Sequence, residues 1–139
     1  MTKQRANAIN ALLVVRVASF LEPYLESLSD HSIETDGNTI EVLGQEDSTP
    51  TSLFILIQLK INEEFKQVFI PKIFLPPTLR HQGIGKRLIK VVYDAATQSG
   101  YELFIALMTE SFYARMIRRG ALPCEQPDMV QIVSSTRLD

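Results

Sequence analysis

The stretch KIFLPPTLRHQGIGKRLI, residues 72–89, decides the expected fold, because it joins an apolar strand to an amphipathic helix through a loop that carries two glycines. Gly83 and Gly85 let a backbone approach a ligand without Cβ clashes. The first turn of the helix that follows offers unpaired N–H groups and the positive end of the helix dipole. Together these features predict a loop that binds phosphate.

The charges around this loop favour the same interpretation. No Asp or Glu occurs from Phe65 to Tyr93, whereas basic residues recur throughout that span. A solvated helix face can produce the same imbalance, so the charge pattern supports the phosphate loop without proving it. The basic residues are Lys66, Lys72, Arg80, Lys86, Arg87 and Lys90.

Two common nucleotide-binding motifs are excluded by their spacing. A dinucleotide-binding fingerprint needs a third small residue where this chain has Leu88. A P-loop needs Gly at the position of Arg80 and Ser or Thr at the position of Arg87.

The remaining chain predicts alternating strands and helices. The order strand, strand, helix, strand, helix, strand is typical of an α/β layer on a mixed sheet, which binds ligands beyond the carboxyl end of a strand. The pattern predicts an N-terminal helix over residues 2–28 that is broken or kinked near Pro23, a loop over 29–37, strands over 39–43, 52–61, 67–75, 102–108 and 129–134, and helices over 83–99 and 110–119.

One proline interrupts the strand that leads into the phosphate loop. Pro71 lies within residues 67–75 and cannot donate a ladder hydrogen bond. We therefore expect an irregular or unpaired side of the strand near Pro71, which leaves backbone groups available to a ligand.

Composition limits the class of protein. The chain has 139 residues, 45% of them hydrophobic, which suits one domain with one core. A formal net charge of -2 argues against nucleic acid as the main partner. The single cysteine, Cys124, is expected to be a buried structural thiol, and it gives neither a disulfide nor a metal site. The apolar run over residues 11–21 is short for a bilayer and poor as a signal peptide, so we expect a cytoplasmic protein with no membrane partner.

The segment Arg80-His81-Gln82-Gly83-Ile84-Gly85 resembles the signature of the GCN5-related N-acetyltransferases, the GNAT family. That signature is Arg or Gln, two residues, Gly, one residue, then Gly or Ala. The context is also similar, with Pro76 directly after the apolar strand and an amphipathic helix after the motif. A second family segment, an aromatic-bearing helix that closes on Gly, resembles residues 111–121. The resemblance covers residues 52–122.

The resemblance implies a mixed, mostly antiparallel central sheet flanked by helices, in a single domain over residues 1–139. No convincing strand precedes the first helix, so the N-terminal part, where the family holds its acceptor, looks shortened. The implied cofactor is acetyl-coenzyme A (acetyl-CoA). Its pantetheine arm would bind the backbone of Ile73, Phe74 and Leu75, and its diphosphate would bind the backbone N–H groups of Arg80, His81, Gln82, Gly83, Ile84, Gly85 and Lys86.

The family's usual catalytic acid is absent. Its Tyr, four residues before the Gly that ends the second helix, is replaced by Met116, which cannot donate a proton. Tyr113, one turn earlier, could serve instead or could simply pack against the sheet. Glu110 is a candidate base near the expected acetyl group, and Glu34 and His31 are weaker candidates because they lie in the expected N-terminal loop.

The resemblance implies direct transfer of acetyl from acetyl-CoA to an amine in a ternary complex. The acceptor would be a small-molecule or peptide amine, with no metal ion, and a homodimer is left open. The alternative is a non-catalytic acyl-CoA-binding or regulatory module, which Met116 favours. A protein-interaction domain that has lost the cofactor is the weakest reading, because the phosphate loop is intact.

Overall fold

The computed structural model describes residues 2–139, with side chains from Ala8 onward, and it contains one seven-stranded sheet in the order β1-β2-β3-β4-β5-β7-β6. Only β4 and β5 pair in parallel, and the other neighbours are antiparallel. The predicted mixed, mostly antiparallel α/β sheet is confirmed. The elements are α1 (Thr2–Leu25), β1 (Asp30–Asp36), β2 (Thr39–Gln45), β3 (Leu53–Asn62), β4 (Gln67–Ile73), α2 (Ile84–Gln98), β5 (Glu102–Ile105), α3 (Glu110–Arg118), β6 (Leu122–Pro123) and β7 (Val130–Ile132), with short 3-10 turns at Pro50–Ser52 and Pro77–Leu79.

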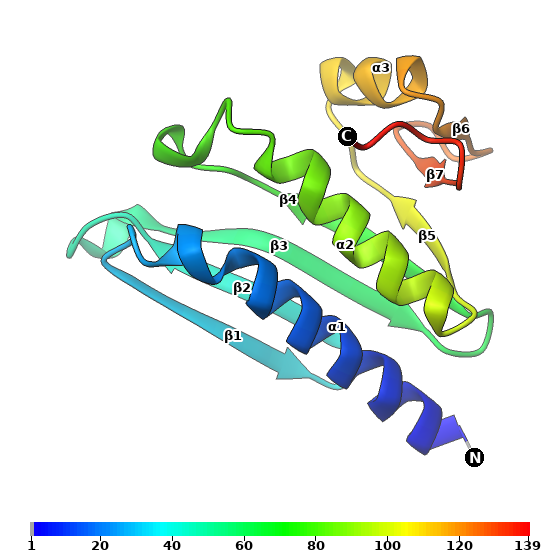
Figure 1. Cartoon of the computed structure of the whole chain (residues 1–139), viewed down its shortest axis with the longest axis horizontal. Helices are drawn as coiled ribbons and strands as arrows, with labels where there is room; N and C mark the ends of the chain where they lie inside the picture. Colours follow the sequence, from blue (N-terminus) through cyan, green and yellow to red (C-terminus); the bar gives the residue numbers. More distant parts are fainter. Residues whose placement is uncertain (1) are drawn as a thin grey trace.

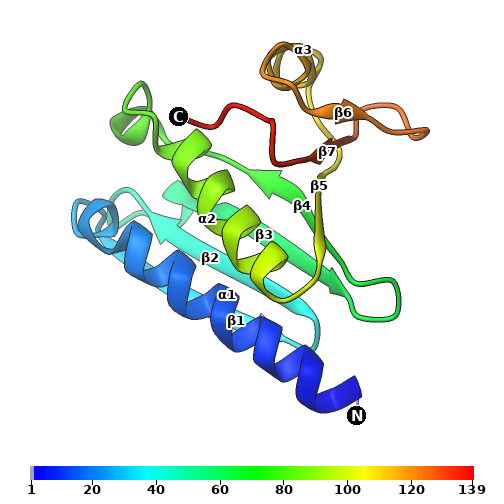
Figure 2. The same ribbon diagram turned by 45° about the vertical axis from the view of Figure 1, so that its right-hand side comes forward.

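Helices α1 and α2 lie side by side on one face of the sheet, and α3 lies near β6 and β7 (Figures 1 and 2). Each of the two long helices buries one apolar stripe, as the helical period requires. In α1 the buried stripe is Ile9, Leu13, Val17, Leu21 and Leu25, and in α2 it is Ile84, Leu88, Ile89, Val92, Ala95 and Ala96. The core therefore lies between this helical layer and the sheet.

The apolar part of α1 is longer than the sequence estimate. Residues Ala8–Leu25 are long and apolar enough, by length and composition alone, to cross a membrane. The apolar run over residues 11–21 therefore belongs to a longer apolar helix, which is not too short for a bilayer as was expected. In this fold the buried stripe of α1 packs into the hydrophobic core, and the core helix of a globular protein meets the same criteria of length and composition.

Strand β1 was not expected, because residues 29–37 read as a polar loop. Its ladder with β2 runs from Asp30↔Gln45 to Asp36↔Thr39, and Gly37 turns the chain between the two strands at φ +59°. Nearly all side chains of β1 are exposed at the edge of the sheet, so the strand carries no apolar alternation. The alternation of apolar and polar residues by which strands are recognised in a sequence is therefore missing from β1.

Pro23 does not break the first helix. The helix continues through Pro23 to Leu25, so no separate second helical piece forms. A proline this close to the last residue removes one hydrogen bond without interrupting the body of the helix.

The irregularity predicted at Pro71 is present in β4. Gln58 of β3 pairs with Lys72, whereas Lys60 pairs with Phe69, so β4 has one residue more than β3 between these two pairs. This is the geometry of a β-bulge, which bends the strand.

Strands β4 and β5 then separate. Their parallel pairing ends at Ile70↔Ile105, while β4 continues to Ile73 along β3. The sheet therefore opens between β4 and β5 at their carboxyl ends.

Candidate functional site

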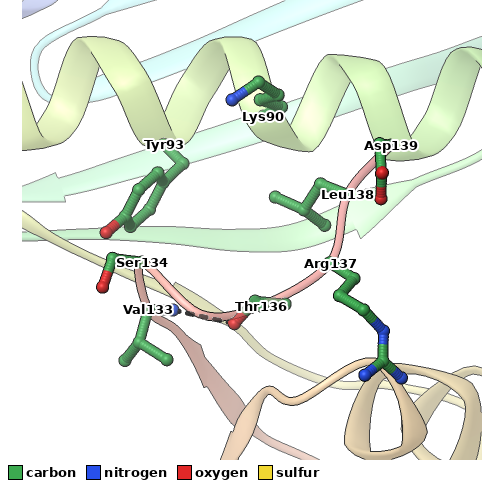
Figure 3. Close-up of a pocket in the computed structure, with 8 residues that line it drawn as sticks. All are labelled: Lys90, Tyr93, Val133, Ser134, Thr136, Arg137, Leu138 and Asp139. Carbon is green, nitrogen blue, oxygen red and sulfur yellow. Dashed lines mark hydrogen bonds between the residues drawn. The ribbon is translucent and has the colours of Figure 1, made fainter.

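A cleft of about 760 Å³ contains this opening. Its walls are the end of β4, the start of α2, the residues that follow β5, and one side of α3. Its volume falls within the range of about 300–1,000 Å³ that is usual for ligand pockets. A second hollow, between α2 and the C-terminal residues (Figure 3), has a volume of about 180 Å³, which lies below this range.

Backbone polar groups face the cleft at the end of β4. The N–H of Phe74 donates to the carbonyl of Leu56 in β3 at 2.8 Å, which directs Phe74 toward β3. Because backbone direction alternates along a strand, Ile73 and Leu75 direct their N–H and C=O groups to the other side, toward the opening. The carbonyl of Leu75 accepts a hydrogen bond from Nε of Arg80 at 2.7 Å.

The loop before α2 depends on two residues in the left-handed region. His81 has φ +64° and Gly83, the N-cap of α2, has φ +73°. Histidine tolerates this region better than most residues, and glycine adopts it without steric cost. A Cβ on Gly85 would meet only Cδ1 of Leu75, at 3.5 Å, so the helix start is open on the side of the cleft.

The first turn of α2 presents N–H donors. The first hydrogen bond of the helix runs from the N–H of Arg87 to the carbonyl of Gly83 at 3.2 Å. The N–H groups of residues 84–86 precede it and have no acceptor within the helix. Ile84, Gly85 and Lys86 all line the cleft, so these donors lie at its wall.

The charged residues that line the cleft are all basic. No Asp or Glu lies among the lining residues in the part of the chain that the structure describes, and the one ion pair found there joins Lys90 to Asp94, outside the cleft. Such a cleft attracts an anion. The basic lining residues are Lys72, Arg80, Lys86, Arg115 and Arg119, with His81 beside them.

Arg115 and Arg119 were not predicted as site residues. Arg115 lies in α3 and Arg119 is the C-cap of this helix, four residues later. Both line the cleft, together with Phe112 and Met116 of α3. Spacing of three and four residues on an expected helix was the available signal.

The predicted cofactor-binding residues gather in this cleft, with one exception. Gln82 does not line it, and its side chain instead donates to the carbonyl of Thr78 at 3.0 Å. The residues that do line it are Ile73, Phe74, Leu75, Arg80, His81, Gly83, Ile84, Gly85 and Lys86.

The two predicted catalytic residues, Tyr113 and Glu110, lie outside the cleft. Tyr113 is half-buried and packs against the hydrophobic core, and Glu110 is exposed in the first turn of α3; neither lines the cleft. Met116 does line it and is 2% exposed. Glu34 and His31 are exposed on β1. The roles of Tyr113 and Glu110 remain predictions.

The only cysteine, Cys124, lies outside the cleft, between β6 and β7, and it is half-buried, so the expectation of a fully buried thiol is wrong. Burial raises the pKa of the Cys124 thiol, so it is mostly protonated at neutral pH. A protonated thiol is a poor nucleophile.

No protein-family model matches the chain, and no curated protein matches it by sequence. Among solved structures, a Klebsiella pneumoniae protein assigned as an acyl-CoA N-acyltransferase is similar, with 18% identity, TM-score 0.45, and coverage of 87% of this chain and 88% of that one. An aminoglycoside acetyltransferase from an uncultured soil metagenomic sample has 19% identity, TM-score 0.42, and coverage of 92% and 88%. A GNAT family N-acetyltransferase from Escherichia coli, in complex with CoA, has 16% identity, TM-score 0.39, and coverage of 91% and 73%.

Proposed function

We propose that this protein is an acetyl-CoA-dependent N-acetyltransferase of the GNAT type. The observation that carries the proposal is the continuity of the cleft, which joins the opening between β4 and β5 to the glycine-bearing start of α2. A ligand with a polar arm and a phosphate group could contact both parts at once. Basic side chains along the same cleft complement the phosphates.

The residues present fit acetyl-CoA. The backbone of Ile73 would pair with the amides of the pantetheine arm, as an added strand does, with Phe74 and Leu75 beside it. The N–H groups of residues 80–86 would hold the diphosphate, with those of residues 84–86 backed by the helix dipole. When bound, acetyl-CoA would supply an activated acetyl thioester.

Transfer would be direct, with the acceptor amine attacking the thioester in a ternary complex. The attacking amine must be neutral, so a base is needed for an amine that is protonated at neutral pH. We keep Glu110 as the candidate base and Tyr113 as the candidate acid for the leaving thiolate. The acceptor would be a small-molecule or peptide amine.

We also propose a cytoplasmic protein with a single domain. One sheet and one core include elements from α1 to β7. A lone cysteine fits a compartment where disulfides are rare.

A second candidate is a non-catalytic acyl-CoA-binding module. It is favoured by Met116, a side chain without a proton to give, which lines the cleft where the family has its acid. Incubation with acetyl-CoA and a panel of amines separates the two functions. Release of free thiol with any amine supports the enzyme, and binding without release supports the module.

The proposal is tested by thermal unfolding with and without CoA. A ligand that binds only the folded state adds about 2.7 kcal/mol of stability at one hundred times its Kd, so the melting temperature should rise by several degrees. Gly85→Val should abolish this rise, because its side chain would enter the cleft while φ at this position suits any residue.

Ala11→Val, at an exposed position of α1, is the matched control for placing a β-branched residue in a helix. It should keep the full rise. A wild-type protein whose melting temperature ignores saturating CoA would contradict the proposed function.

A further inference from the structure

Arg87 stands directly after the glycine pair and Lys86, where its charge predicts a phosphate ligand. The structure turns its side chain the other way, toward α1. Its Nη2 donates to the hydroxyl of Tyr24 at 3.0 Å, and its guanidinium lies 5.6 Å from the ring centroid of Phe20 and 5.8 Å from that of Tyr24. Arg87 does not line the cleft.

The same guanidinium holds two carbonyls of the phosphate loop. Nη2 donates to the carbonyl of Gln82 at 3.0 Å, and Nε donates to the carbonyl of Gly83 at 3.3 Å. In a planar trans peptide the C=O and the following N–H point in opposite directions. The N–H groups of Gly83 and Ile84 therefore point away from Arg87.

We propose that Arg87 is a positioning residue that sets the donors of the loop for an anion without touching the anion itself. Its side chain joins the Phe20–Tyr24 pair of α1 to the carbonyl side of the loop, which leaves the N–H side for the diphosphate. This inference rests on the proposed binding of CoA. It predicts that Tyr24, which does not line the cleft, contributes to CoA affinity through Arg87.

Two conservative variants test the contact from both sides. Arg87→Lys keeps the charge but loses the planar fork that bonds three acceptors together. Tyr24→Phe keeps the ring and removes only the hydroxyl that accepts from Arg87. Isothermal titration with CoA should show a Kd about 5- to 30-fold higher for Arg87→Lys and a smaller increase, about 2- to 5-fold, for Tyr24→Phe, in line with the loss of hydrogen bonds to a charged group.

A double variant and two controls separate positioning from charge and from general stability. In Arg87→Lys/Tyr24→Phe the losses should be less than additive, because both act through one contact. Lys86→Met removes a charge that lines the cleft, so it should reduce the salt dependence of CoA binding, whereas Arg87→Lys should keep it. The melting temperature of each CoA-free variant should stay within about 3 °C of wild type, because these contacts are exposed.

Several results would overturn the inference. Wild-type CoA affinity in Arg87→Lys would show that charge alone suffices. Full additivity, or an unaffected Tyr24→Phe beside a weakened Arg87→Lys, would show that Arg87 acts without α1. A large fall in melting temperature at unchanged CoA affinity would show a role in stability only. If wild type binds no CoA, the proposed function fails and this inference fails with it; any of the first three results leaves the proposed function standing.

Discussion

Leu107 combines two unfavourable features at the edge of the cleft. Its φ is +54°, in the left-handed region, and its side chain is 78% exposed. A residue with a Cβ costs about 1–2 kcal/mol in that conformation. Leu107 lies two residues after the end of β5 and lines the cleft, so the strain lies where a ligand would bind.

Replacing Leu107 by glycine should relieve this strain at little cost in burial. Leu107→Gly should leave the free energy of unfolding unchanged or raise it by up to about 1 kcal/mol, after the extra entropy of glycine in the unfolded chain is counted. Val15→Gly, at an exposed position inside α1, should instead lower it by about 1 kcal/mol. Urea unfolding measures both. A loss above about 1 kcal/mol in Leu107→Gly would mean that its side chain stabilises the fold.

Tyr113 has two alternative roles, as the acid that protonates the leaving thiolate or as a residue that only packs against the core. Its ring packs against the core and Met116 lines the cleft in its place, so Tyr113→Phe keeps the observed contacts and removes only the hydroxyl. If the hydroxyl protonates the leaving thiolate, kcat should fall at least about tenfold at unchanged CoA affinity. Unchanged turnover in an active enzyme would assign Tyr113 to packing. The thiolate would then leave without its help.

At the scale of elements, the sequence predicted those parts whose burial follows a period. Helix α2 and the β3–β4 hairpin show apolar patterns that match their buried faces, and Pro71 located the irregular point of β4 because a proline cannot join the ladder. Strand β1 escaped because an exposed edge strand needs no apolar face. Its existence depends on backbone pairing with β2, which no local pattern records.

The residues of the candidate site also differ in how far the sequence could predict their positions. Gly83 and Gly85 were recognisable from their spacing in the sequence, although only Gly83, at φ +73°, has a backbone conformation that favours glycine. The direction of Arg87 was not, because its partner Tyr24 lies 63 residues away in the chain and meets it only when α1 packs beside α2. The position of Met116 in the cleft wall and of Tyr113 against the core likewise depends on how α3 rotates over its neighbours.

In the molecule as a whole, the proposed ligand site lies where the pairing of β4 and β5 ends. The bulge in β4, the end of β4–β5 pairing and the start of α2 meet in the same cleft, and the basic side chains of α3 close it from the other side. Helix α1 contributes through Tyr24 and Phe20, which contact Arg87 of α2 on the side away from the cleft. If CoA binds in this cleft, its contacts can be mapped residue by residue.

The most direct measurement is a titration of 15N-labelled protein with CoA, followed by the backbone amide signals. We expect the largest shifts at residues 80–86 and at Ile73, with smaller shifts on the cleft side of α3 near Arg115. Amides around the small hollow beside Tyr93 should hardly move. Saturating CoA that leaves the signals of residues 80–86 unchanged, or that shifts only residues outside the cleft, would contradict the proposed binding of CoA.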